Sequence, residues 1–351
     1  MQEKYIDIGE RRVGRGHPCF IIAEAGVNHN GQLSLARKLV DIAVDANCDS
    51  VKFQSFKTEL FATPDTPKAK YSLAGTDQTE SHTDMLQTLE LNSSEHQTLF
   101  NYCGSRGIVF LSSPFEETSA DMLEMIGVSG FKIASGELTN LPLLEHVATF
   151  GKPMIVSTGM ADLMEVDQAI RSITEHGNEQ IVLLHCTTAY PTIPEDVNLR
   201  AMETLATAFG FPVGYSDHTR GNEVAIAAVA MGACLIEKHV TLDRTLPGPD
   251  QQASIEASEL DVLVKAIRAV ETSLGDGLKK PRPSEIETTI TARKSLVAAR
   301  DIPQGTAISR DMLVLKRPGS GLPASMLPIV VGRSVRCDVP VNTLISLDVL
   351  G

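Results

Sequence analysis

The stretch LIEKHVT, residues 235–241, decides how the fold of this chain is interpreted. Apolar residues at both ends indicate a short strand, yet Glu237, Lys238 and His239 stand in its middle. Side chains alternate across a strand, so Glu237 and His239 share one face and Lys238 takes the other. Burying a carboxylate with an imidazole is costly without a partner. A metal ion or an anionic substrate would be such a partner.

Seven similar apolar runs precede this stretch, and amphipathic segments of helical period follow most of them. Segments such as LSLARKLVDIAVDA, residues 33–46, indicate the helices. Strands that alternate with helices predict parallel βαβ units, and eight of them predict a closed (β/α)8 TIM barrel, an α/β fold. The predicted strands begin at Phe20, Ser50, Ile108, Phe131, Met154, Ile181, Pro212 and Cys234.

Nearly every predicted strand ends in polar residues. The carboxyl ends of barrel strands open onto one face, and that face holds the site. Strand ends are also polar where they merely meet water. That alternative suffices for a single serine, but it explains two lysines and two histidines poorly.

Charge and composition exclude several classes of protein. The chain has 351 residues and a formal net charge of -13, which argues against a nucleic-acid partner. No apolar run reaches the roughly 18 residues of a membrane span. The first residues hold charges throughout and lack the apolar core of a secretion signal, so we expect a cytoplasmic protein. The six cysteines form no C-x-x-C pair, and free thiols are expected.

The last part of the chain differs from the rest in its sequence pattern and contains an internal repeat. DIPQGTAISRDML, residues 301–313, recurs as DVPVNTLISLDVL, residues 338–350. Gly305 and Asn342 suit turn positions with positive φ, so each copy is interpreted as a turn between two short strands. We therefore expect a catalytic barrel over residues 1–275, a linker over 276–290 and a small β-rich domain over 291–351.

His218 follows the seventh predicted strand, and His239 lies in the eighth. Adjacent strands lie near 4.8 Å apart, so we expect the two imidazoles within about 5–10 Å of each other. At that spacing they can share a divalent ion whose other positions are filled by water and substrate oxygens. Two hydrogen-bonded barrel histidines remain the alternative.

Lys52 and Lys132 are expected at the same mouth, together with the hydroxyl groups of Ser135, Ser157 and Ser216. Two ammonium groups ringed by hydroxyls suit a phosphate and a carboxylate together. Glu137 beside such a cluster could act as acid or base. The alternative is that the two lysines pair with Glu24 and Glu137.

Two further segments are singled out. The connection from Phe56 to Met85 is long, polar and broken by Pro and Gly, which is typical of a lid or a binding loop. In the small domain, RPGSG from Arg317 predicts a rigid exposed turn, in which Arg317 is either a ligand-binding residue or a solvated surface residue.

Eight motifs in this order resemble those of the sialic acid synthases, the phosphoenolpyruvate-dependent nonulosonate synthases. They are AEAGVNHNG, VKFQSFK, KIASGE, STGM, LLHCTTAYP, GYSDHT, EKHVTLDRTLPGPD and KRPGSG. The likeness extends from about Phe20 to the C-terminus. It implies that the terminal part is the family's antifreeze-protein-like (SAF) domain, which explains the repeat.

The resemblance also implies roles for individual residues. His218 and His239 would hold a divalent metal, most often Mn²⁺, with Mg²⁺ or Co²⁺ as alternatives. Phosphoenolpyruvate would bind Lys52, Lys132, Ser135, Ser157 and Ser216. The acylamino sugar would bind Glu24, Gln54, Tyr190, Asp250 and Arg317. Ser113 and Thr188 would also be substrate-binding residues. Arg317 would reach the partner's site in a domain-swapped homodimer.

The expected reaction is the condensation of phosphoenolpyruvate with open-chain N-acetylmannosamine, which gives N-acetylneuraminate and phosphate. The metal would polarise the aldehyde, and Glu24, Glu137, Glu237 and Lys52 would be the catalytic residues. The alternative sugar is 2,4-diacetamido-2,4,6-trideoxymannose, which would make the chain a diacetyllegionaminate synthase. Gln251 and Thr188 depart from residues that other members carry there, and they leave the sugar open. A metal-dependent barrel hydrolase or isomerase and a non-catalytic sugar-binding protein are the less favoured functions.

Overall fold

The computed structural model describes residues 4–77 and 79–351. Eight parallel strands form one sheet in the order β5-β4-β3-β10-β9-β8-β7-β6. The first barrel strand along the chain, β3, pairs with the last one, β10. Among the described strands the ladder is open between β5 and β6, so the barrel is nearly closed. The strands are β3 (Phe20–Gly26), β4 (Ser50–Ser55), β5 (Val109–Pro114), β6 (Phe131–Ile133), β7 (Met154–Ser157), β8 (Ile181–Cys186), β9 (Val213–Asp217) and β10 (Leu235–His239).

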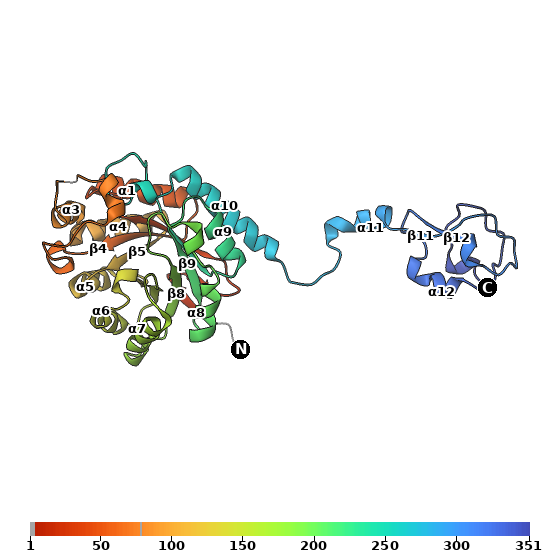
Figure 1. Ribbon diagram of the computed structural model, residues 1–351, viewed down its shortest axis with the longest axis horizontal. Helices are drawn as coiled ribbons and strands as arrows, with labels where there is room; N and C mark the ends of the chain where they lie inside the picture. Colours follow the sequence, from red (N-terminus) through yellow and green to blue (C-terminus); the bar gives the residue numbers. More distant parts are fainter. Residues whose placement is uncertain (1–3, 78) are drawn as a thin grey trace. The chain divides into compact units, whose positions relative to one another are not determined.

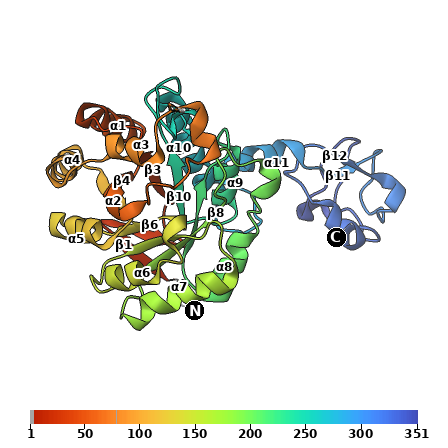
Figure 2. The same ribbon diagram turned by 60° about the vertical axis from the view of Figure 1, so that its left-hand side comes forward.

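Helices surround the barrel strands, as Figures 1 and 2 show. The predicted (β/α)8 barrel is therefore confirmed, and each predicted strand begins within one residue of an observed one. The helices of this unit are α1 (Leu33–Asp45), α2 (Thr58–Phe61), α3 (His82–Leu89), α4 (Ser93–Arg106), α5 (Glu117–Ile126), α6 (Leu141–Ala148), α7 (Leu163–Glu175), α8 (Ala201–Phe209), α9 (Glu223–Ala230) and α10 (Ala257–Leu274).

Local sequence signals mark where these helices begin and end. Asn92 and Asp162 each accept backbone N–H groups in a capping box at the start of α4 and α7. Gly107, Gly127 and Gly210 follow α4, α5 and α8 in the left-handed conformation that closes a helix at little steric cost. Each of these three helices therefore connects to the start of the next strand through a short loop of two to four residues.

Apolar side chains cover the strands on both faces. All seven residues of β3 are buried, as expected of a parallel strand with the barrel interior on one side and helices on the other. Phe20, Leu111 and Leu184 belong to the cluster that fills the interior.

A hairpin that the sequence analysis did not anticipate closes the amino end of the barrel. Strands β1 (Tyr5–Ile8) and β2 (Arg11–Gly14) pair in antiparallel fashion, and Ile8 and Val13 are fully buried in the interior cluster. This packing fills the amino end of the barrel, opposite the carboxyl ends of the strands.

The long connection after β4 is more ordered than its composition suggested. It contains α2, the 3-10 turn η1 (Lys70–Ala74) and the start of α3. Ser81 caps α3 by accepting a hydrogen bond from the Asp84 backbone N–H. The segment that was interpreted as a lid or a binding loop thus also supplies a helix next to the barrel mouth.

The chain divides into two compact units, Met1–Gly275 and Asp276–Gly351. The expected linker over residues 276–290 is only partly irregular, because the turn η5 (Pro283–Glu285) and helix α11 (Ile286–Ala292) begin within it. Pro283 at the start of η5 and the backbone bonds of the following turn explain why this polar segment forms a helix.

The second unit is built from the two copies of the repeat. Ile302 and Val339 bridge in antiparallel fashion, and the carboxylates of Asp301 and Asp338 each accept a backbone N–H from the other copy. The predicted positive φ values are confirmed, at 82° for Gly305 and 65° for Asn342. The remaining elements are β11 (Ser295–Ala298), β12 (Leu313–Lys316), η6 (Arg310–Met312), η7 (Ala324–Met326), α12 (Leu327–Val330) and η8 (Leu347–Val349).

Within residues 4–77 and 79–351, no helix combines the length and the apolar character that crossing a membrane would require.

Candidate active site

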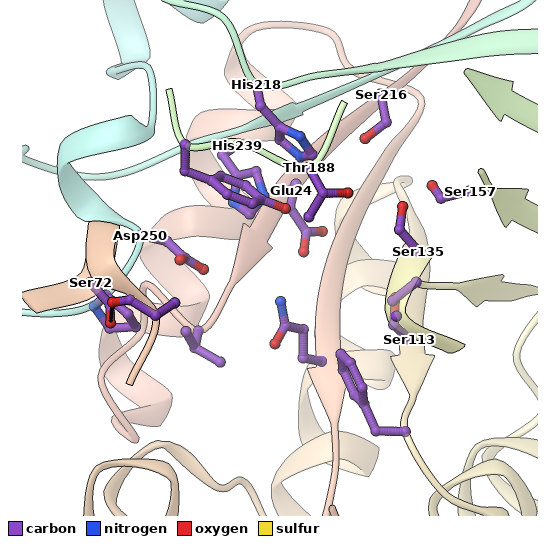
Figure 3. A pocket seen from close by; sticks show the side chains of 18 of the residues that line it. Glu24, Ser72, Ser113, Ser135, Ser157, Thr188, Ser216, His218, His239 and Asp250 are labelled. Carbon is purple, nitrogen blue, oxygen red and sulfur yellow. Dashed lines mark hydrogen bonds between the residues drawn. The ribbon is translucent and has the colours of Figure 1, made fainter. Parts of the chain in front are cut away.

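A cavity of about 540 Å³ opens at the carboxyl ends of the barrel strands. In the view of Figure 3, Ser113, Ser135, Ser157 and Ser216 lie along one side, and Asp250 lies on the other. All but two of the predicted site residues line this cavity. They are Glu24, Lys52, Gln54, Ser113, Lys132, Ser135, Ser157, Thr188, Tyr190, Ser216, His218, Glu237, His239 and Asp250.

The strand register explains why residues distant in sequence meet here. Glu24 in β3 lies opposite His239 in β10 on one side and opposite Lys52 in β4 on the other. Glu237 in β10 lies opposite Ser216 in β9 in the same way. These residues lie in the middle or toward the carboxyl ends of their strands, and all of them line the same cavity.

A buried cluster of alternating charges forms the floor of the cavity. The Lys52 ammonium lies 2.7 Å from Glu24 and 3.9 Å from Glu237, and it donates to Ser113 Oγ at 3.1 Å. The Lys132 ammonium lies 3.3 Å from Glu237. The alternative pairing of the lysines with Glu24 and Glu137 is therefore half right, because Lys132 pairs with Glu237 instead of Glu137.

The two carboxyl groups of this cluster differ in protonation. Burial raises the pKa of Glu24 to about 7, against the opposing effect of Lys52. Burial alone would also raise the pKa of Glu237, but Lys132 and Lys52 outweigh it and lower that pKa to about 2. Glu237 is thus a carboxylate at neutral pH, whereas Glu24 can take up or release a proton.

Hydroxyl groups without partners face the cluster. Ser157 Oγ and Thr188 Oγ1 are buried and have no hydrogen-bond partner among the described residues. A Cβ atom on Gly159 would lie 2.2 Å from Thr188 Oγ1 and 2.7 Å from Ser135 Oγ, so only glycine leaves this space open. Free donors beside two ammonium groups suit an anion with several oxygens.

The two predicted metal ligands lie together, with ring centroids 5.4 Å apart. His218 Nδ1 lies 2.9 Å from the Thr187 carbonyl oxygen, which favours a proton on Nδ1 and leaves Nε2 with its lone pair. His239 Nδ1 is buried and has no partner among the described residues. These features fit a divalent ion held by two imidazoles.

Other oxygens would have to complete such a site. Across the part of the chain that the structure describes, no group of three or more His, Cys, Asp or Glu side chains is arranged to surround a metal ion. Burial raises the pKa of nearby Asp250 to about 6, so this carboxyl group can also exchange a proton near neutral pH.

Two predicted site residues do not line the cavity. Glu137 is directed toward the start of α6, where its carboxylate accepts a hydrogen bond from Asn140 Nδ2 at 2.7 Å. Arg317 lies in the second unit, where its Nε donates to the Ala292 carbonyl oxygen at 3.0 Å. The expected acid or base role of Glu137 is not supported by this geometry.

Several lining residues were missed by sequence reasoning. Cys186, interpreted as a buried thiol, lines the cavity with its Sγ atom 3.7 Å from His218 Nδ1. Tyr71 and Ser72 line it from η1, and the Tyr71 ring lies 4.7 Å from that of Tyr190. Helix α3 contributes residues whose 3.6-residue period was present in the sequence and could have revealed the helix.

Gln251, one of the two departures noted in the sequence, does not line the cavity. It is fully buried, and its Nε2 donates to the Asn28 carbonyl oxygen at 3.1 Å. Thr188, the other departure, does line the cavity.

Two known families match this chain. The NeuB family matches residues 39–279, and the SAF domain matches residues 293–350. The chain therefore belongs to the NeuB family and ends in a SAF domain, which confirms the resemblance to the sialic acid synthases.

Individual relatives cover nearly the whole chain. An N,N'-diacetyllegionaminic acid synthase of Legionella pneumophila is 46% identical and covers 94% of both chains. A synthase of the same name from Campylobacter jejuni is 47% identical over 89% of this chain and 94% of its own. The expectation that this chain is an enzyme of the nonulosonate synthase family is thus confirmed.

A solved structure supports the same relationship. The N-acetylneuraminic acid (sialic acid) synthetase of Leptospira borgpetersenii, in complex with citrate, superimposes with a TM-score of 0.72 at 36% identity. The match covers 82% of this chain and 95% of that one.

Proposed function

We propose that this chain condenses phosphoenolpyruvate with open-chain 2,4-diacetamido-2,4,6-trideoxymannose to give a legionaminate-type acid and phosphate. The observation that carries the proposal is the meeting of Lys52, Lys132, His218 and His239 in one cavity. Ammonium groups for a small anion and imidazoles for a metal are the two requirements of this chemistry.

The relatives favour the diacetamido sugar over N-acetylmannosamine. The two diacetyllegionaminic acid synthases are 46% and 47% identical to this chain, whereas the sialic acid synthetase of known structure is 36% identical. Diacetyllegionaminate synthesis, the alternative expected from the sequence, is therefore preferred to the main expectation, N-acetylneuraminate synthesis.

Phosphoenolpyruvate would bind at the charged floor. Lys52 and Lys132 supply the positive charge, and the free hydroxyl of Ser157, with Ser113, Ser135 and Ser216 nearby, supplies hydrogen bonds. Fixing the anion in this way aligns its carbon 3 with the sugar, which is where a large part of the rate gain arises.

His218 and His239 would hold the divalent ion, for which Mn²⁺ is proposed and Mg²⁺ or Co²⁺ are alternatives, with water and substrate oxygens completing its coordination. When bound, such an ion acts as a Lewis acid on the aldehyde oxygen of the sugar.

The carboxyl groups would manage charge and protons. Carbon 3 of phosphoenolpyruvate bonds to the aldehyde carbon, and positive charge develops at carbon 2 beside the Glu237 carboxylate. Glu24, with its raised pKa, can give a proton to the new alkoxide oxygen and regain one from the water that adds to carbon 2. Phosphate then leaves with cleavage of the bond between carbon 2 and its bridging oxygen.

The test is an assay of the purified protein with Mn²⁺, phosphoenolpyruvate and each candidate sugar. Phosphate release should require both substrates, and water labelled with ¹⁸O should place its label in the sugar acid and leave the phosphate unlabelled. Phosphate release without a sugar, or label in the phosphate, would contradict the condensation. Sugar conversion without phosphoenolpyruvate would indicate a hydrolase or isomerase, and sugar binding without turnover would indicate a binding protein.

We also propose a domain-swapped homodimer in which Arg317 serves the partner's site. The support is the family resemblance of the KRPGSG motif, which contains Arg317 and lies in the second unit.

A further inference from the structure

One face of helix α3 turns toward the cavity and differs in character from the rest of its wall. His82, Met85, Leu86 and Leu89 stand at positions i, i+3, i+4 and i+7 of the helix, and all of them line the cavity. Residues with this spacing share one side of a helix. We call these residues the α3 face.

The α3 face belongs to an apolar end of the cavity. Met85, Leu86 and Leu89 are buried in a cluster that also includes Val27. Phe115 packs against it, and its ring lies 4.6 Å from the ring of Phe61. The floor of the cavity is charged and polar, because the buried lysines and serines lie there. The cavity therefore has one charged end and one apolar end.

His82 adds one polar side chain to this apolar end. Its Nδ1 atom is buried and has no hydrogen-bond partner among the described residues. Leaving a buried polar nitrogen unsatisfied is costly, so a ligand that occupies this end should offer it one hydrogen bond among apolar contacts.

The chemistry at the charged end determines which part of a sugar arrives here. The aldehyde carbon must lie near His218 and His239, next to the bound phosphoenolpyruvate. In the proposed reaction, the opposite end of the open-chain sugar, carbons 4 to 6, would extend away from the charged floor and toward the apolar end of the cavity.

We infer that the α3 face selects the sugar, with Met85, Leu86 and Leu89 receiving a carbon-6 methyl group and His82 receiving a carbon-4 acetamido group. This inference rests on the proposed function. A methyl group is stabilised by leaving water for this surface. A hydroxymethyl group would lose its hydrogen bonds to water there without finding replacements.

Three sugars separate the two contacts. They are 2,4-diacetamido-2,4,6-trideoxymannose, 2-acetamido-2,6-dideoxymannose, which lacks the second acetamido group, and N-acetylmannosamine, which also has a carbon-6 hydroxyl. The wild-type kcat/KM should fall in that order. Each contact should be worth a factor of about 10 or more, as is usual for one group in a selective pocket.

Two substitutions should each affect one ratio. Met85→Gln, which conserves volume, should reduce the preference for the dideoxy sugar over N-acetylmannosamine by about 10-fold. His82→Leu should reduce the preference for the diacetamido sugar over the dideoxy sugar and leave the first ratio in place. Leu86→Asn provides a second polar replacement should Met85→Gln fail to fold.

Three controls accompany these variants. Met85→Leu keeps the surface apolar and should keep the wild-type preference. Gln87→Ala changes an exposed residue of the same helix and should alter neither ratio. The KM for phosphoenolpyruvate should stay near the wild-type value in every variant, because the anion binds at the other end.

The outcomes separate this inference from the proposed function. Unchanged sugar ratios in both polar variants, or an equal loss on all three sugars, would overturn the role of the α3 face while phosphate release by the wild type upheld the condensation. Wild-type protein that releases no phosphate with any of the sugars would overturn the proposed function itself.

Discussion

Two buried serines illustrate, at the scale of single residues, how hydrogen-bond partners distinguish a ligand-binding group from a structural one. Ser157 Oγ faces the cavity and has no partner among the described residues, whereas Ser55 Oγ lies 2.7 Å from Ser112 Oγ and 3.3 Å from His96 Nε2. The first hydroxyl is available to a substrate, and the second is already used inside the protein.

Replacing each serine by alanine should therefore have opposite effects. Ser157→Ala should raise the KM for phosphoenolpyruvate by about 10-fold or more, the value of a hydrogen bond to a charged group, and should leave the free energy of unfolding nearly unchanged. Ser55→Ala should lower the free energy of unfolding by about 1–2 kcal/mol and leave KM in place. Steady-state kinetics and urea unfolding measure both, and a stability loss in Ser157→Ala without a change in KM would contradict the assignment.

Two buried histidines outside the cavity should make the protein sensitive to acid. Burial lowers the pKa of His29 and of His96 from 6.5 to about 4. Between these values the unfolded chain binds protons that the folded chain does not bind, so the free energy of unfolding falls as the pH falls. Above pH 6.5 the two states bind alike, and the loss is complete below about pH 4.

The expected loss is at most about 3 kcal/mol for each histidine. Urea unfolding at several pH values between 7.5 and 4 measures it. His96→Gln keeps an acceptor near Ser55 and removes the titrating ring, so its stability should fall less steeply than that of the wild type. Parallel pH curves for the two proteins would argue against the contribution of His96.

At the scale of elements, strands β9 and β10 are joined by a fully buried ion pair. Lys238 lies opposite Asp217 in the ladder, its ammonium is 2.7 Å from the Asp217 carboxylate, and it donates to the Thr219 carbonyl oxygen at 2.6 Å. Asp217 also accepts the backbone N–H of Thr219 at 2.9 Å. This pair fixes the turn that carries His218, and it answers what Lys238 does on the face of β10 away from the cavity.

Breaking this pair should be strongly destabilising. Lys238→Met should lower the free energy of unfolding by about 3–5 kcal/mol, because it leaves the Asp217 charge buried and alone. Asp217→Asn combined with Lys238→Met should cost less than the two single changes together. Lys265→Met, which breaks an exposed pair with Asp261, is the matched control and should cost about 0.3–0.5 kcal/mol. A loss below 1 kcal/mol for Lys238→Met would show that the pair contributes little.

At the scale of the whole molecule, the proposed domain swap has a decisive test in mixed subunits. His239→Ala and Arg317→Ala should each abolish or severely reduce turnover when alone. When the two variants are co-expressed, a swapped heterodimer holds one site with both side chains intact. Random pairing should restore about a quarter of the wild-type sites.

Two outcomes of this mixing experiment contradict the swap. If Arg317 served the barrel of its own chain, each site in the heterodimer would lack one side chain, and activity would stay at the level of the single variants. A monomer in solution, measured by sedimentation, would exclude the arrangement directly.

The sequence by itself determined the order of strands and helices, because periods of 2 and 3.6 residues and buried apolar runs are local properties. It also indicated the end of each strand that carries the chemistry, since parallel strands of a barrel open onto one face. The repeat with Gly305 and Asn342 was equally local, because positive φ depends on the residue and its turn.

Only the tertiary structure decided which of these residues contact each other. Lys132 pairs with Glu237, more than a hundred residues away, and leaves Glu137 beside its near neighbour Asn140, because strand register determines which carboxylate lies within reach of the ammonium. Likewise, the α3 face lines the cavity only because the connection after β4 lies over the barrel mouth. Such contacts depend on closure of the whole ring, so no local pattern specifies them.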